Sequence, residues 1–118
     1  MQFCLGITKN KINPKNLKGS VIFIPMVNIP AFQAQKRCNP LDNKNLNRLF
    51  PGDSSGENSE KIAFFVFEQA NKIANIIVDL HSGGERWVVP FYVLVPREDT
   101  VTHINSLELA KFIDCPTI

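Results

Sequence analysis

The stretch Ala74-Asn-Ile-Ile-Val-Asp-Leu80 decides the fold class of this chain, because its apolar run predicts a buried β-strand. This strand would end at His81, shortly before the flexible pair Gly83-Gly84. Open α/β sheets place ligands in the crevice outside the carboxyl ends of their strands. We therefore expect an α/β domain with a polar site at His81.

Two more apolar segments extend the predicted sheet. Ser20-Val-Ile-Phe-Ile-Pro-Met-Val27 is apolar on both faces, which is typical of a strand buried on both sides of an α/β sheet. Residues 88–95 predict a third strand, interrupted by Pro90 and closed by Pro96. Cys115-Pro-Thr-Ile118 would enter another strand.

Two segments predict helices. The first opens at Glu57 and runs to about Lys72, with acidic residues near its N-terminus. It would pack on the sheet through the apolar side chains of Ile62, Phe65, Val66 and Ile73. The second covers residues 106–113, with Ser106 as its N-cap.

The remaining segments predict loops. Residues 9–19 are a polar connector, and residues 28–58 are rich in Pro, Gly, Asn, Asp and Ser. Loops of that length in compact domains are usually functional or disordered. We expect one domain over residues 1–118, with a polar lead-in at 1–18 and the main region at 19–118. Its predicted class is α/β, with a mixed sheet and flanking helices.

The composition is that of a globular chain. Of its 118 residues, 44% are hydrophobic and 20% are charged, and the net charge of +2 does not predict a nucleic-acid partner. No apolar run approaches the roughly 20 residues that span a bilayer, so we expect no membrane insertion. The N-terminus does not resemble a secretory signal, and the three scattered cysteines lack a Cys-x-x-Cys pair. These features favour reduced thiols and a cytoplasmic location.

His81 is the strongest single candidate for chemistry. It follows Asp79 by two residues at a strand end, so both side chains would lean to the same face, and an imidazole there can bind zinc. The alternative is a histidine that hydrogen-bonds to backbone at the strand end.

Asn47 and Arg48 are the second candidate site. The planar guanidinium of arginine can bind a carboxylate through two parallel hydrogen bonds, and a neighbouring amide adds a directional donor. The pair suits recognition of an acidic end group. The alternative is a loop arginine that forms an ion pair with Asp42 or Asp53.

Three motifs together carry a family resemblance: Arg37, Asn45-Leu-Asn-Arg-Leu-Phe-Pro-Gly52 and Asp79-Leu-His-Ser-Gly-Gly84. From about Gly19 onward the chain resembles the succinylglutamate desuccinylase and aspartoacylase family of the zinc carboxypeptidase-like superfamily. The resemblance implies a partial α/β/α domain of that fold, truncated at both ends. It also implies a zinc-dependent hydrolase that acts on an N-acyl amino acid or a related small amide or ester.

The same resemblance assigns roles to individual residues. His81 corresponds to the third zinc ligand, and Asn47 and Arg48 to the residues that hold the carboxylate of a small-molecule substrate. Arg37 corresponds to the catalytic arginine that polarises the scissile carbonyl, a role that a fixed positive charge near the developing oxyanion can fill. The alternative for Arg37 is a solvated surface arginine beside Lys36.

Two parts of the family's machinery are absent from the sequence. No His-x-x-Glu motif, the source of the other two zinc ligands, occurs in the 118 residues, and no residue matches the general-base glutamate. Glu85 or Cys38 could approach a metal. For His103 we expect a surface or capping role. We expect the isolated chain to be an inefficient hydrolase. It would be a gene remnant, one piece that needs a complementing chain, or a carboxylate-binding module, and its unpaired sheet edges would favour self-association.

Overall fold

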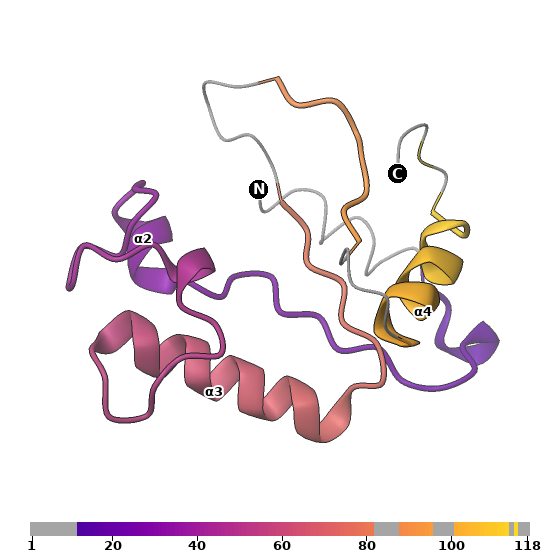
Figure 1. The fold of residues 1–118 in the computed structure, drawn as a ribbon, viewed down its shortest axis with the longest axis horizontal. Helices are drawn as coiled ribbons and strands as arrows, with labels where there is room; N and C mark the ends of the chain where they lie inside the picture. Colours follow the sequence, from indigo (N-terminus) through magenta and orange to yellow (C-terminus); the bar gives the residue numbers. More distant parts are fainter. Residues whose placement is uncertain (1–11, 82–87, 96–100, 114, 116–118) are drawn as a thin grey trace. The chain divides into compact units, whose positions relative to one another are not determined.

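The computed structural model describes residues 12–81, 88–95, 101–113 and 115, and it divides into two compact units. The first unit is Met1–Leu80 and the second is His81–Ile118. Most of the regular structure lies in the first unit (Figure 1). Each unit is described by itself below.

The described part of the first unit contains two α-helices and two short 3-10 helices. In chain order these are η1 (Pro14–Asn16), α2 (Ile29–Gln33), η2 (Leu46–Arg48) and α3 (Asn58–Ile73). Two of them, α2 and η2, lie within residues 28–58, which the sequence predicted as a loop. That prediction missed both short helices, because each is only one turn long and is set by a local asparagine cap.

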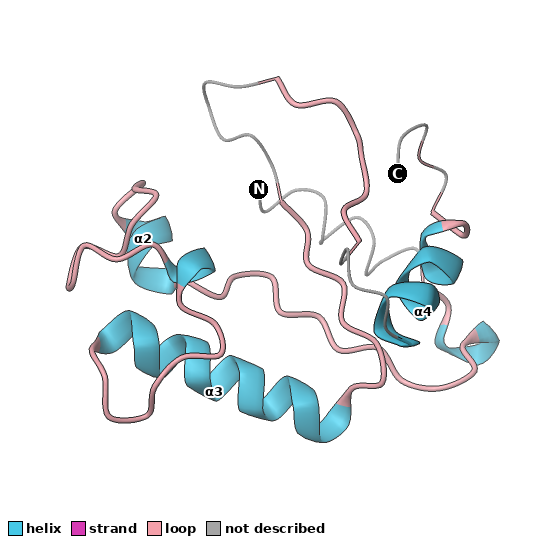
Figure 2. Ribbon diagram, in the orientation of Figure 1, coloured by secondary structure: helices cyan, strands magenta, loops and turns pink. Residues whose placement is uncertain are grey.

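The predicted mixed sheet is not confirmed. Within the described residues no strand is present, and Figure 2 shows residues 20–27, 74–80 and 88–95 as loop. A strand needs a neighbour to accept and donate its backbone hydrogen bonds, and an apolar run alone does not provide one. Most of Cys115–Ile118 lies outside the described residues.

Helix α3 confirms the prediction at Glu57–Lys72 to within one residue. No Pro or Gly interrupts the segment, and Glu57 and Glu60 form a capping box at its start. The helix ends where Ala74 turns to extended backbone. The predicted buried face was wrong, however, because Ser59 and Ala63 are the buried residues of α3.

The four apolar side chains predicted to cover a sheet are only partly covered. Phe65 and Ile73 are exposed, whereas Ile62 and Val66 are half-buried. Three of these side chains, Ile62, Phe65 and Val66, line an open apolar groove of about 440 Å³ together with Val27, Pro30, Leu41, Asn58 and Lys61. The face of α3 that packs is therefore the one turned toward the loop before it.

The second unit contains α4 (Val101–Ala110) among its described residues. The sequence placed this helix at 106–113 with Ser106 as N-cap, and His103 ahead of it. Both expectations were wrong, since Ser106 and His103 lie inside the helix. Residues 101–105 contain neither Pro nor Gly, so nothing prevents helical hydrogen bonding from starting earlier.

Few large apolar side chains are fully buried. Among the described residues the buried hydrophobic side chains are Ala31, Leu46, Ala63 and Ala110. By contrast, Ile22, Ile76 and Leu80 of the predicted strands are about 60% exposed. None of the described helices has the length and apolar character that crossing a membrane requires.

Candidate functional site

The predicted residues Arg37, Asn47 and Arg48 lie in one segment of the first unit, between α2 and α3. All three are exposed to solvent. Cys38, next to Arg37, is half-buried and is a free thiol. Since the exposed side chains have little packing of their own, their positions depend on how the backbone of this segment is held.

The start of the segment is set by α2. The side chain of its N-cap, Asn28, accepts a hydrogen bond from the backbone N–H of Ala31 at 3.2 Å. Gln35, at a φ of 52°, occupies the left-handed region that helix ends often use. The Lys36 N–H then donates to the carbonyl of Ala31 at 2.9 Å, which fixes the chain immediately before Arg37.

Residues 39–44 form a closed loop that centres on Asn39. Its N–H donates to the carbonyl of Lys44 at 2.9 Å, and its carbonyl accepts from the N–H of Asn43 at 2.8 Å. Its side-chain oxygen accepts from the N–H of Leu41 at 3.0 Å. Asn39 is 0% exposed. A buried amide with its hydrogen bonds satisfied in this way gives the loop a defined shape.

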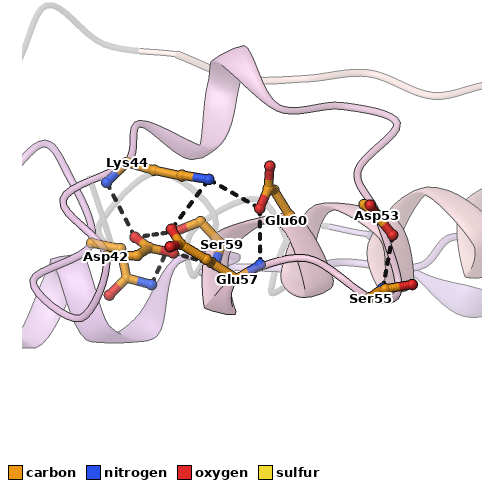
Figure 3. A network of polar contacts seen from close by, with 8 residues as sticks. Asp42, Lys44, Asp53, Ser55, Glu57, Ser59 and Glu60 are labelled. Carbon is orange, nitrogen blue, oxygen red and sulfur yellow. Dashed lines mark hydrogen bonds and ion pairs between the residues drawn. The ribbon is translucent and has the colours of Figure 1, made fainter.

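A polar clamp, made of Asn39, Asp42 and Ser59, joins this loop to the first turn of α3 (Figure 3). Asn39 Nδ2 donates to Ser59 Oγ at 3.0 Å, and Ser59 Oγ donates to Asp42 Oδ1 at 2.9 Å. The Ser59 N–H donates to Asp42 Oδ2 at 2.6 Å. Asp42 therefore satisfies a helix N–H that has no partner within α3.

The clamp changes the proton affinity of Asp42. Partial burial raises the pKa of the Asp42 carboxyl, but the hydrogen bonds from Ser59 and Lys44 outweigh that effect. The net result is a pKa below the ordinary value of 3.8. Asp42 is thus a carboxylate at neutral pH, and its negative charge lies favourably at the N-terminus of α3.

Lys44 adds a second connection between the loop and α3. Its Nζ lies 3.2 Å from Glu57 Oε2 and 3.0 Å from Glu60 Oε2. The hydrogen bonds to Glu60 and Glu57 raise the pKa of Lys44. The pKa of Glu60 is lowered, first by the hydrogen bond from the Glu57 N–H and then by Lys44. These ion pairs are open to solvent and therefore support the clamp more weakly than its hydrogen bonds do.

The Asn47-Arg48 pair follows the clamp as the 3-10 helix η2. Its N-cap, Asn45, accepts through Oδ1 from the N–H of Asn47 at 3.1 Å. Leu46 is 7% exposed, and η2 packs against α3. Leu46 is therefore the buried side chain of η2, whereas Asn47 and Arg48 are exposed.

The end of the segment is fixed by Gly52. A Cβ at this position would clash with the Phe64 backbone nitrogen and the Glu60 carbonyl oxygen, so only glycine lets the chain approach α3 this closely. Its φ of +88° also favours glycine. The Asp53 N–H donates to the Glu60 carbonyl at 3.2 Å. Residues 45–52 are thus held at both ends.

The alternative partners considered for Arg48 have other contacts. Asp42 is bound to Ser59 and Lys44, and the Asp53 side chain accepts from the Ser55 N–H at 2.7 Å. Within the described part of the chain no ion pair joins Arg48 to either aspartate.

His81 opens the second unit and is exposed. Glu85 lies outside the described residues. Zinc sites take three or four protein ligands, and no cluster of three or more His, Cys, Asp or Glu side chains suited to a metal occurs in residues 12–81, 88–95, 101–113 and 115. His103 is half-buried within α4. The described residues alone do not make up a zinc site.

Sequence reasoning missed the residues that hold this segment in place, namely Asn39, Asp42, Ser59 and Gly52. A partial signal was present for two of them. Asp42 lies within a loop rich in Asn and Pro, and Gly52 follows Pro51 as in a turn. The link from Asp42 to Ser59, 17 residues later in the chain, has no local signature.

Comparison with known proteins identifies the class. Residues 7–118 match the model of the succinylglutamate desuccinylase/aspartoacylase catalytic domain. The chain is 36% identical over 108 residues to the N-alpha-acetyl-L-2,4-diaminobutyric acid deacetylase of Halomonas elongata, covering 91% of this chain and 32% of that protein. Both matches indicate a hydrolase family, and the curated relative is named as a deacetylase.

A solved structure agrees with this assignment. The crystal structure of a succinylglutamate desuccinylase/aspartoacylase from Rhodobacter sphaeroides is 36% identical, with a TM-score of 0.64 over 70% of this chain and 26% of that chain. The chain therefore belongs to the succinylglutamate desuccinylase/aspartoacylase family, as its motifs predicted. It spans about a third of the length of the curated relative that it matches.

Proposed function

We propose that this chain supplies the substrate-binding segment of a zinc-dependent deacylase that hydrolyses an N-acyl amino acid or a related small amide or ester. The observation that carries the proposal is the exposed Asn47-Arg48 pair, which lies in a segment held at both ends. The deacetylase from Halomonas elongata supports the substrate class, since its name describes removal of an acetyl group from an amino acid.

Asn47 and Arg48 suit the carboxylate of such a substrate. The Arg48 guanidinium would donate two parallel hydrogen bonds to the carboxylate oxygens, and the Asn47 amide would add a third donor. A charge-assisted pair of this kind fixes orientation as well as affinity. Binding would therefore require the carboxylate itself and a planar donor at position 48.

Arg37 belongs to the same segment. It precedes the loop formed by residues 39–44, whereas Asn47 and Arg48 follow that loop. We propose that it faces the acyl group of the bound substrate. There its fixed positive charge would stabilise the negative charge that develops on the carbonyl oxygen during hydrolysis. Its exposure to solvent is consistent with contact to a ligand.

We propose His81 as one zinc ligand. A single imidazole holds zinc poorly, so the 118-residue chain by itself should not be an efficient hydrolase. Metal analysis after dialysis against zinc should find no tight one-to-one complex, in the wild type as in His81→Ala. Two results together would contradict this expectation. The first is tight zinc binding that is lost in His81→Ala and kept in the control His103→Ala, and the second is zinc-dependent turnover.

The alternative is a carboxylate-binding module without zinc. It uses the same Asn47-Arg48 pair and requires no bound metal. A complementing chain would then be a partner rather than a requirement. In either case we propose a cytoplasmic location, in keeping with Cys38 as a free thiol.

Titration with N-acetylglycine, the smallest N-acyl amino acid, tests the proposed carboxylate site. We expect the wild type to bind it, and Arg48→Ala to raise the Kd by about tenfold or more, the value of a hydrogen bond to a charged group. N-acetylglycinamide, which lacks the carboxylate, should not bind. Lys36→Ala, an exposed cation on the same segment, is the matched control. Equal Kd values for wild type and Arg48→Ala would refute the proposal.

A further inference from the structure

The polar clamp lies between the residues proposed to bind substrate. Asp42 follows Arg37 by five positions and precedes Asn47 by five, so the tether to α3 sits at the middle of the binding segment. Figure 3 shows the Asp42 carboxylate turned toward Ser59 at the start of α3. Two of its three residues, Asn39 and Ser59, are 0% exposed, and Asp42 is half-buried.

Burying the polar groups of the clamp costs desolvation free energy, which an apolar contact would avoid. Each buried donor or acceptor must be matched, and a partly satisfied set is worse than an apolar one. In the described residues every buried side-chain nitrogen and oxygen has a partner. Such fully satisfied networks specify one geometry more sharply than apolar packing, which tolerates shifts.

The clamp is continuous with η2 through short, hydrogen-bonded backbone. Lys44, whose carbonyl accepts from Asn39, directly precedes Asn45, the N-cap of η2. The Lys44 N–H also donates to Asp42 Oδ1 at 3.1 Å. A displacement of Asp42 from Ser59 would therefore shift Asn47 and Arg48, whose side chains have no burial of their own to hold them.

We propose that Asp42 and Ser59 are positioning residues for the carboxylate site, which hold Asn47 and Arg48 in their binding orientation through the buried and partly buried hydrogen bonds of the clamp. This inference rests on the proposed function of Asn47 and Arg48. The clamp acts before substrate arrives, since a segment that is already ordered loses less conformational entropy on binding. Asp42 and Ser59 themselves touch no substrate.

Two variants and a matched control test the inference. Asp42→Asn keeps the size of the side chain but loses its charge and one acceptor, and Ser59→Ala removes the hydroxyl while remaining compatible with a helix. Asp53→Asn makes the same chemical change at an exposed aspartate of the segment between η2 and α3. The probe is N-acetylglycine, and Arg48→Ala is measured in parallel.

We expect Asp42→Asn and Ser59→Ala each to raise the Kd by roughly threefold to tenfold, in line with the loss of one or two net hydrogen bonds. Asp53→Asn should keep the wild-type Kd. The NMR order parameters of the Asn47 and Arg48 amides should fall from about 0.85 toward about 0.6 in the two clamp variants. Amides of residues 62–72 in α3 should stay protected from hydrogen exchange, which separates lost positioning from a general loss of structure.

The possible failures are distinguishable. If Arg48→Ala weakens binding but the clamp variants keep the wild-type Kd and order parameters, the positioning role is overturned and the proposed function stands. If the clamp variants lose protection throughout α3, Asp42 and Ser59 serve helix stability and the positioning role is overturned as well. If wild type and Arg48→Ala bind N-acetylglycine equally, the proposed function falls and this inference falls with it.

Discussion

At the scale of single residues, Gly52 gives the sharpest prediction about stability. A Cβ would lie 2.8 Å from Phe64 Cα and closer still to two other backbone atoms of α3. These atoms belong to a helix backbone and cannot move aside as a flexible side chain could. Because the clash and the strain of a positive φ act together, we expect Gly52→Ala to lower the free energy of opening of α3 by about 2 to 4 kcal/mol. Hydrogen exchange of the α3 amides measures this value.

Gly19 is the matched control for that substitution. It also has a positive φ, of +117°, but a methyl group added there would meet no atom within 4 Å. Gly19→Ala should therefore carry the backbone strain alone, about 1 to 2 kcal/mol, and leave exchange in α3 unchanged. Equal loss of α3 protection in both variants would show that close packing at Gly52 is not what holds the loop.

Single residues also differ in how well their roles could be predicted from the sequence. Arg37, Asn47 and Arg48 could be chosen from sequence because arginine and asparagine indicate their chemistry by type and by motif. Asp42 and Ser59 could not, because carboxylates and hydroxyls are common in loops and their pairing depends on the path of the chain. The sequence therefore predicted the residues that we propose to face a ligand, and it missed the residues that we propose to orient them.

At the scale of elements, the start of α3 should respond to pH in a defined direction. Asp42 and Glu60 have folded-state pKa values below their ordinary values of 3.8 and 4.5. A lowered pKa contributes stability that is present above the ordinary value and is lost as the pH falls through the folded value. Lys44 has a raised pKa, so its contribution is present below 10.5 and is lost as the pH rises through the folded value.

We therefore expect the first turn of α3 to be most stable between about pH 5 and pH 10. Hydrogen exchange of the Ser59 amide across this range, corrected for intrinsic rates, measures the effect. Asp42→Asn should change the pH at which the Ser59 amide loses protection in acid, and it should make that loss smaller. Glu68→Gln, which removes the exposed i,i+4 pair with Lys72 at the other end of α3, should leave it in place. An acid transition unchanged by Asp42→Asn would exclude the clamp as its source.

Elements differ in how far local sequence determines them. Helix α3 was predicted closely because its hydrogen bonds and its capping box are internal to 17 consecutive residues, from Glu57 to Ile73. Residues 20–27, 74–80 and 88–95 have the apolar pattern of strands, yet a strand exists only where another segment completes the ladder. Their side chains are largely exposed in this structure. The apolar pattern predicts which side chains such a segment would bury. Whether they are buried depends on another segment that pairs with it.

At the scale of the whole molecule, the exposed apolar segments predict self-association. Ile76, Ile77 and Val78 are each more than half exposed, and no described strand pairs with their backbone. Extended apolar chain with unpaired N–H and C=O groups is a template for pairing with another chain. We expect the purified 118-residue chain to form oligomers or aggregates at micromolar concentration, as measured by size-exclusion chromatography with light scattering.

A charged double variant and its matched control separate this cause from a general effect of charge. Ile76→Glu with Val78→Glu removes two exposed apolar side chains, which as alternate residues would share one face of an extended segment. Asn71→Glu with Asn75→Glu adds the same charge at exposed polar positions nearby. The first pair should shift the chain toward monomer, whereas the second should not. A monodisperse wild-type monomer that unfolds cooperatively would contradict the expectation, because it would require these apolar side chains to be covered within a single chain.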